Sequence, residues 1–217
     1  MLTKRLRSVL NEIPQGNWSV ADIGADHSKL IVTAVLENRC SIGYAVDISY
    51  PSLIKGKNYA ERKCVSQQIE FLHGNGFLPI NNEIDYAVIC GMGGNEITSI
   101  LSQKDIAKTY ILSPHQDAHV LRKYLNENAF TAVKDYVVYD KKFYPIIVAV
   151  KGNGVYSEKE IYLGKNLPKT DDYEVKNQRR LDYLEKQLGI NLENKCQYKN
   201  ELREEYEVLK EWQRSVT

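Results

Sequence analysis

The chain has 217 residues, of which 43% are hydrophobic and 26% charged, values typical of a protein that buries a core in water. No run approaches the roughly 18–20 apolar residues of a membrane span, and no apolar run of signal-peptide length follows the N-terminus. A net charge of +1 does not indicate a nucleic-acid binder by composition. We expect a cytoplasmic protein without disulfides and favour a monomer, although the sequence leaves the oligomeric state open.

Predicted strands and helices alternate along the first 130 residues. The predicted helices are 3–13, 29–38, 51–63, 95–101 and 117–128. The predicted strands are 18–23, 41–46, 68–72, 86–90 and 109–112, followed by a hairpin of 130–139 and 143–150. This order predicts an α/β, Rossmann-like fold with a seven-stranded, mostly parallel sheet and an antiparallel strand at or near its edge. It favours a methyltransferase over a dehydrogenase, whose Rossmann domain generally ends in a further parallel strand.

A different element follows the hairpin. Residues 151–170 contain three glycines and Pro168, so we predict a connecting segment there. Two helical stretches come next, with Gly189 between them and apolar residues spaced three and four apart: Leu181, Leu184, Leu188, and Leu202, Tyr206, Leu209. We predict a main domain over 1–160 and a C-terminal extension over 161–217 that forms a helical hairpin, an antiparallel coiled coil.

The segment 22–30, DIGADHSKL, follows the first predicted strand. Gly24 lets the backbone turn tightly beside a ligand, and the next helix presents free N–H groups. A dinucleotide fingerprint would need glycines where Asp26 and Lys29 stand. Asp22 and Asp26 would repel a pyrophosphate but attract the ammonium and sulfonium groups of S-adenosylmethionine. The loop favours that cofactor over NAD, and an ordinary strand-to-helix turn capped by aspartate is the alternative.

Three further loops follow strands at the same edge of the predicted sheet. Asp47 lies about 20 residues after Gly24, the spacing at which an acid binds ribose hydroxyls. Asn75, between two glycines, can meet an adenine edge with a donor and an acceptor. The glycine turn 91–94 borders the cleft that a doubly wound sheet forms at its carboxyl edge. Each loop alone also fits an ordinary turn or strand-end cap.

The histidines and cysteines do not indicate a metal site. His115 and His119 are four residues apart and could share a helix face, but no third ligand accompanies them. The four cysteines match no common zinc spacing. We therefore expect no metal.

Four motifs carry a family resemblance: ADIGADHSKL, GNGF, ICGMGGNEITSIL and ILSPHQDAHVLRKYL. In this order they resemble the bacterial tRNA (adenine-22-N1)-methyltransferase family over residues 1–170, and the C-terminal extension is similar too. The resemblance implies a class I methyltransferase fold and S-adenosylmethionine as methyl donor. It implies that the acceptor is N1 of adenine 22 in the D-arm region of tRNA.

By match to the family motifs, the resemblance implies roles for individual residues. The predicted cofactor-binding residues are Asp22, Gly24, Asp26, His27, Asp47, Ile48, Asn75, Gly76 and Gly91. The first four are expected at the methionine end of the cofactor, Asp47 at its ribose, and Asn75 and Gly76 near its adenine. The predicted catalytic residues are Asp26, His27, Gly91, Met92 and Gly93, with His27 and Met92 flanking the target base.

Two alternatives remain open from the sequence. One is a methyltransferase that acts on a small molecule or a protein. The other is a non-catalytic RNA-binding or partner-binding module on a methyltransferase scaffold.

Overall fold

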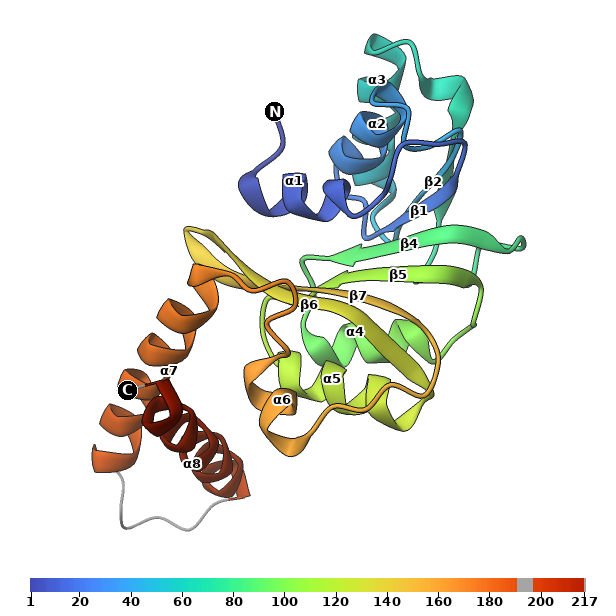
Figure 1. Cartoon of the computed structure of the whole chain (residues 1–217). Coiled ribbons are helices and arrows are strands. Elements are labelled where there is room, and N and C mark those ends of the chain that lie inside the picture. Colours follow the sequence, from blue (N-terminus) through green and yellow to red (C-terminus); the bar gives the residue numbers. More distant parts are fainter. Residues whose placement is uncertain (191–196, 217) are drawn as a thin grey trace.

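A computed structural model describes residues 1–190 and 197–216, and its central layer is a sheet (Figure 1) that has seven strands. The strand order is β3-β2-β1-β4-β5-β7-β6. The strands are β1 (Ser19–Ile23), β2 (Ile42–Asp47), β3 (Ile69–His73), β4 (Ile84–Cys90), β5 (Ala107–Ser113), β6 (Phe130–Asp140) and β7 (Lys142–Lys151). The first five pair in parallel, and β7 is antiparallel to both β5 and β6. The Rossmann-like fold is confirmed, with the antiparallel strand one place in from the edge.

Helices cover both faces of the sheet (Figure 1). One face carries α1 (Lys4–Asn11), α2 (Lys29–Leu36) and α3 (Tyr50–Arg62). The other carries α4 (Gly94–Leu101) and α5 (Ala118–Glu127). Each face has its own apolar cluster, because alternate side chains of a strand point to opposite faces: Val20, Ala45 and Val88 to one, Ala21, Val46 and Ile89 to the other. Because β1 to β5 are parallel, the loops that follow these strands lie at one edge of the sheet.

Local signals fix where the helices begin. Thr3 caps α1 by accepting a hydrogen bond from the Leu6 N–H through its hydroxyl, at 3.3 Å. Pro51 stands in the first turn of α3, where its missing N–H costs nothing. A short 3-10 turn, η1 (Ser66–Gln68), leads into β3.

The segment 151–170, predicted as a connection, contains a helix, α6 (Glu158–Leu163). Its start is a capping box, because the Ser157 hydroxyl accepts from the Glu160 N–H and the Glu160 carboxylate accepts from the Ser157 N–H. The glycines and Pro168 favoured a connecting segment in the prediction, although this Ser-x-x-Glu pattern indicates the start of a helix. The predicted domain division at residue 160 falls inside α6 and stays a prediction.

A buried ion pair ties this segment to the sheet. The Arg122 guanidinium donates to both carboxylate oxygens of Asp135, at 2.8 and 3.1 Å, and both side chains are 1% exposed. The Tyr156 hydroxyl donates to the same carboxylate at 3.0 Å. Gly164, with φ +88°, lies so close to Arg122 that a Cβ would stand 2.7 Å from Nη2. Elements α5, β6 and the α6 segment are therefore locked together.

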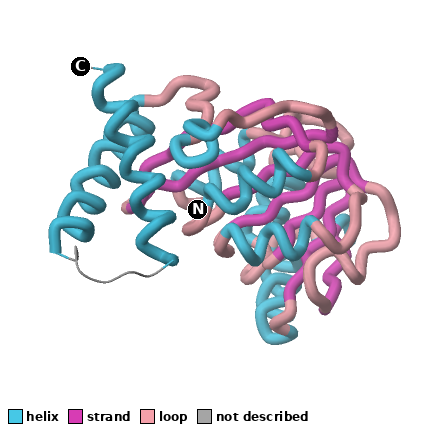
Figure 2. Tube along the Cα trace, turned by 90° about the horizontal axis from the view of Figure 1, so that it is seen from below, coloured by secondary structure: helices cyan, strands magenta, loops and turns pink. Residues whose placement is uncertain are grey.

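Two C-terminal helices, α7 (Asp171–Ile190) and α8 (Gln197–Val216), stand beside the layered body (Figure 2). Leu181 and Leu184 of α7 pack with Leu209 and Trp212 of α8. The sequence predicts Gly189 between the helices, but it lies within α7, where a single glycine costs only about 1 kcal/mol. The Leu188 side chain and Cys196 fall outside the described residues, and the coiled-coil detail stays a prediction.

None of the helices in the described part of the chain is long and apolar enough to cross a membrane.

Candidate active site

The loop between β1 and α2 is built from left-handed backbone positions. Gly24, Asp26 and Ser28 have φ of 72°, 42° and 52°. The N–H groups of Gly24 and Ala25 both donate to the Val46 carbonyl, at 2.8 and 3.0 Å, so β2 holds the loop. Glycine is favoured at position 24, because φ is positive there, and a Cβ would stand 2.3 Å from Cε of Met92, the movable end of that side chain.

Asp47, the last residue of β2, fixes two neighbouring loops. Its Oδ2 accepts from the Asp26 N–H at 2.8 Å, and its Oδ1 accepts from the Ser49 N–H at 2.7 Å. The Asp26 carboxylate accepts from the Ser52 hydroxyl at 3.3 Å, and His27 Nε2 lies 3.7 Å from it. Because a carboxylate oxygen accepts more than one hydrogen bond, Asp47 keeps acceptor capacity for a ligand.

Asp22 is the buried acid of the site, at 5% exposure. The pKa of its carboxyl is raised to about 7, mainly by burial; a hydrogen bond from the Ile31 backbone opposes the rise, and the nearby Asp47 charge adds a smaller increase. A buried carboxyl without a cation is costly to ionise, so a positively charged ligand group beside it would be stabilised.

The turn after β4 is held from three sides. The Gly91 N–H donates to the Ser113 carbonyl at 3.4 Å, and the His115 N–H donates to the Met92 carbonyl at 3.0 Å. The Glu96 carboxylate accepts from the Gly93 N–H at 2.8 Å. Gly91 has φ +81°, which favours glycine. Glu96 is in the first turn of α4, so the helix start and the turn form one unit.

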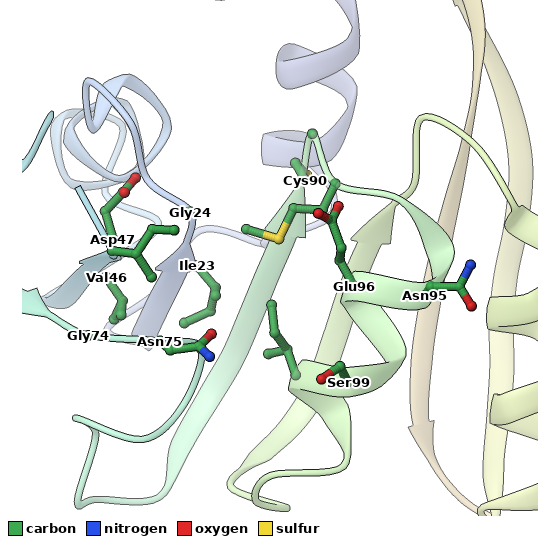
Figure 3. Close-up of a pocket in the computed structure, with 15 residues that line it drawn as sticks. Ile23, Gly24, Val46, Asp47, Gly74, Asn75, Cys90, Asn95, Glu96 and Ser99 are labelled. Atoms are coloured by element: carbon green, nitrogen blue, oxygen red, sulfur yellow. The ribbon is translucent and has the colours of Figure 1, made fainter.

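Two cavities meet at these loops. The first, of about 600 Å³, has Asp47, Val46 and Asn75 on one side and Glu96 and Ser99 of α4 on the other (Figure 3). The second, of about 350 Å³, is lined by Asp22, Asp26, His27 and the first residues of the chain. Both share Gly24, Cys90 and Gly91, and the Met92 methyl lies against Gly24 at this junction.

The predicted residues divide between the two cavities, which share Gly24 and Gly91. The first cavity is lined by Gly24, Asp47, Ile48, Asn75, Gly76, Gly91 and Met92. The second is lined by Asp22, Gly24, Asp26, His27 and Gly91. Gly93 lines neither and serves the turn through its N–H. Their roles stay predictions.

Sequence reasoning missed two walls of the site. The α4 residues Asn95, Glu96 and Ser99 line the first cavity, and Arg5 with its neighbours on α1 lines the second. The α4 wall had a signal, since a helix that begins directly after a cleft turn must border that cleft. The α1 wall had none, because its position depends on contacts distant in sequence.

The remaining chemistry of the site is limited. Burial raises the pKa of the Cys90 thiol to about 12, so it is protonated at neutral pH and is a poor nucleophile. Within residues 1–190 and 197–216, no group of three or more His, Cys, Asp or Glu side chains is arranged to hold a metal ion.

Comparison with known proteins adds to this geometry. Residues 2–147 match the family described as a methyltransferase domain. The chain is 32% identical over 158 residues to the tRNA (adenine(22)-N(1))-methyltransferase of Bacillus subtilis, an alignment that covers 70% of this chain and 66% of that protein. It is 33% identical over 158 residues to a putative tRNA methyltransferase of Mycoplasma genitalium, covering 69% and 70%.

A solved structure agrees over the whole chain. The structure of M. capricolum TrmK with the cofactor product S-adenosylhomocysteine superposes with a TM-score of 0.84 and 25% identity, covering 98% of this chain and 97% of that one. The C-terminal helices are thus included in the likeness. The chain therefore belongs to the class I methyltransferase family that includes the bacterial tRNA (adenine-22-N1)-methyltransferases.

Proposed function

We propose that the chain transfers the methyl group of S-adenosylmethionine to N1 of adenine 22 in tRNA. One observation carries the proposal: two cavities that share Gly24 and Gly91 are each lined by an acid, Asp47 in one and Asp22 in the other. The identity of the substrate is inferred from the relatives, since the Bacillus subtilis relative is named for this reaction.

The residues present fit S-adenosylmethionine. Asp47 would take the ribose hydroxyls, and Asn75 and Gly76 would border the adenine. Asp22, Asp26 and His27 would hold the methionine end, where a buried carboxyl suits an ammonium group. The glycines at the junction leave room for a ligand that passes close to the backbone, and the flexible Met92 thioether can rotate there. When bound, the cofactor supplies an electrophilic methyl group on a sulfonium.

The chain's own part in catalysis is positioning. N1 of adenine has a free lone pair at neutral pH, so the enzyme needs no strong base and gains its rate from alignment. N1 is blocked in a Watson–Crick pair, so the site must receive an unpaired or extruded base. His27 and Met92 are proposed to flank that base, and Asp26 to offset the positive charge that the methylated adenine acquires.

A third cavity, of about 520 Å³, supports RNA as the substrate. It lies between the β5–α5 loop and the C-terminal helices and is lined by His115, His119, Lys176, Arg179 and Arg180. The Arg179 guanidinium lies 5.3 Å from the centre of the Phe143 ring. Arg179 is exposed beside these rings and suits a sugar-phosphate backbone with splayed bases, whereas Arg180 is paired with Glu205 at 2.7 Å and burial lowers the pKa of Lys176 to about 7. His115 also holds the Met92 carbonyl, so this cleft adjoins the active-site turn.

An RNA-binding measurement tests the role of this cleft. Arg179→Ala is expected to weaken tRNA affinity about tenfold and to reduce its dependence on salt, because one phosphate contact is lost. Lys186→Ala, which removes the same charge from the same helix outside the cleft, is the matched control. Equal effects of the two variants would refute a specific role for the cleft.

Labelled methyl transfer tests the proposed function itself. In two separate reactions, the protein is incubated with labelled S-adenosylmethionine and either tRNA transcripts or tRNA-free cell extract. Label in tRNA supports the proposal. Label only in protein or small molecules favours the alternative methyltransferase, and S-adenosylhomocysteine binding with no transfer to any acceptor favours a non-catalytic module.

A further inference from the structure

The outer wall of the second cavity is the first turn of α1, and Arg5 is its charged residue. Arg5 lines this cavity together with Asp22, Cys90 and Gly91. Its Nη2 lies 3.9 Å from the point where a Cβ on Gly91 would stand. The guanidinium therefore reaches the same turn that borders both cavities.

The position of Arg5 is fixed by the edge hairpin of the sheet. Its guanidinium lies over the Tyr144 ring, with Cζ 4.5 Å from the ring centre. Its backbone N–H donates to Asp140 Oδ2 at 3.0 Å. At the other end of α1, Glu12 accepts from the Tyr136 hydroxyl and pairs with Lys134, both at 2.7 Å. The strands β6 and β7 thus hold the helix, and with it Arg5, against the cavity.

The guanidinium is held in place but keeps its donors. Among the described residues, no carboxylate lies within ion-pair distance of the Arg5 side chain, and no side-chain hydrogen bond from it is formed. Stacking on Tyr144 leaves the edge of the planar group, which carries its N–H donors, open to an acceptor. Such an arginine is prepared to bind a carboxylate through two parallel hydrogen bonds.

The charges of the second cavity match both ends of an amino acid. Asp22 and Asp26 provide the negative side, which suits an ammonium group. Arg5 and Lys29 provide the positive side, and Lys29 is exposed whereas Arg5 is half-buried and stacked. An α-carboxylate is the group that such a cation recognises.

We propose that Arg5, positioned by Tyr144, binds the α-carboxylate of the methionine moiety of the cofactor. The proposal rests on the proposed function only in taking S-adenosylmethionine as the ligand. It makes α1 and the edge hairpin part of the cofactor site, although β4 and β5 separate the hairpin from β1 and β2, the strands that carry Asp22 and Asp47.

Calorimetry with two ligands tests the proposal without any RNA. S-adenosylhomocysteine carries the carboxylate, whereas 5′-methylthioadenosine has the nucleoside and thioether without the amino acid. Arg5→Ala is expected to weaken S-adenosylhomocysteine binding roughly ten- to hundredfold, the loss of a charge-assisted hydrogen-bonded pair, and to leave methylthioadenosine binding unchanged. Arg5→Lys should fall between, because it keeps the charge but not the fork.

Two further variants separate contact from folding. Lys4→Ala, an exposed neighbour on α1, should bind both ligands like wild type. Tyr144→Ala should show a smaller loss for S-adenosylhomocysteine alone. If Arg5→Ala binds S-adenosylhomocysteine normally, or loses both ligands equally, the carboxylate assignment is wrong. Because no tRNA is present, this result is independent of whether tRNA is the methyl acceptor.

Discussion

Replacing Asp22 with asparagine tests whether the site keeps a buried acid for a cation. The change removes the ionisable group and keeps an oxygen that can accept from the Ile31 backbone. Burial raises the pKa of Asp22 from 3.8 to about 7 in the folded chain, so the folded state holds its proton more tightly than the unfolded state. The stability that this proton provides is complete below pH about 4 and is lost as the pH rises to about 7.

The magnitude follows from the pKa difference. A shift of about three pKa units corresponds to about 4 kcal/mol in total, at about 1.4 kcal/mol per unit. Between pH 5 and pH 8 the wild type should lose about 3 kcal/mol that Asp22→Asn does not lose. The difference in unfolding free energy, variant minus wild type, should increase by that amount in the absence of ligand.

Urea unfolding followed by circular dichroism at pH 5 and pH 8 measures this difference. Glu70→Gln, an exposed change on β3, is the control and should show a constant difference from wild type. A constant difference for Asp22→Asn as well would refute the raised pKa.

The same variant has a second readout in ligand binding. A positively charged ammonium favours ionised Asp22, so wild-type affinity for S-adenosylhomocysteine should fall about tenfold per pH unit below pH 7. Asp22→Asn should bind weakly and with little dependence on pH in that range. If wild type and variant show the same pH profile, Asp22 is not the ammonium partner.

Three further predictions concern single side chains. Asp47→Ala should weaken S-adenosylhomocysteine binding roughly ten- to hundredfold by calorimetry, since two ribose hydrogen bonds lose a charged acceptor; unchanged affinity would remove Asp47 from the cofactor site. His27→Ala should lower kcat for methyl transfer by a larger factor than it weakens S-adenosylhomocysteine binding, and full activity would disprove its place beside the target base. Arg122→Ala should destabilise the fold by about 3–5 kcal/mol in urea unfolding, because it leaves the Asp135 carboxylate buried without its cation; a loss below about 1 kcal/mol would contradict the account of this ion pair.

The loops that carry the site were predictable because topology brings them together. In a parallel sheet the carboxyl ends of the strands lie at one edge, so the residues at the ends of β1, β2, β3 and β4 and in the loops after them are neighbours. The residues Gly24, Asp47, Asn75 and Gly91 line one cavity for that reason. What the sequence did not predict is that Asp22 and His27 open into a second cavity beyond the junction.

The unpredicted parts depend on contacts between distant residues. The Arg5 N–H and the Asp140 carboxylate are 135 positions apart, and no local pattern announces such a contact. Helix α6 was predictable from local sequence, unlike the Arg5 contact. Ser157 and Glu160 have the spacing of a capping box, but the glycines around them led to the prediction of a connecting segment. Local signals thus located elements, while long-range packing decided which of them became walls of the site.

The most direct test of the central claim is the position of the methyl group in tRNA. Full-length transcripts with adenine or guanine at position 22 are incubated with the protein and S-adenosylmethionine, and the products are digested and sequenced by mass spectrometry. The account predicts 1-methyladenosine at position 22 of the first transcript and no methylation of the second. Methylation at another position, or equal methylation of both transcripts, would contradict it.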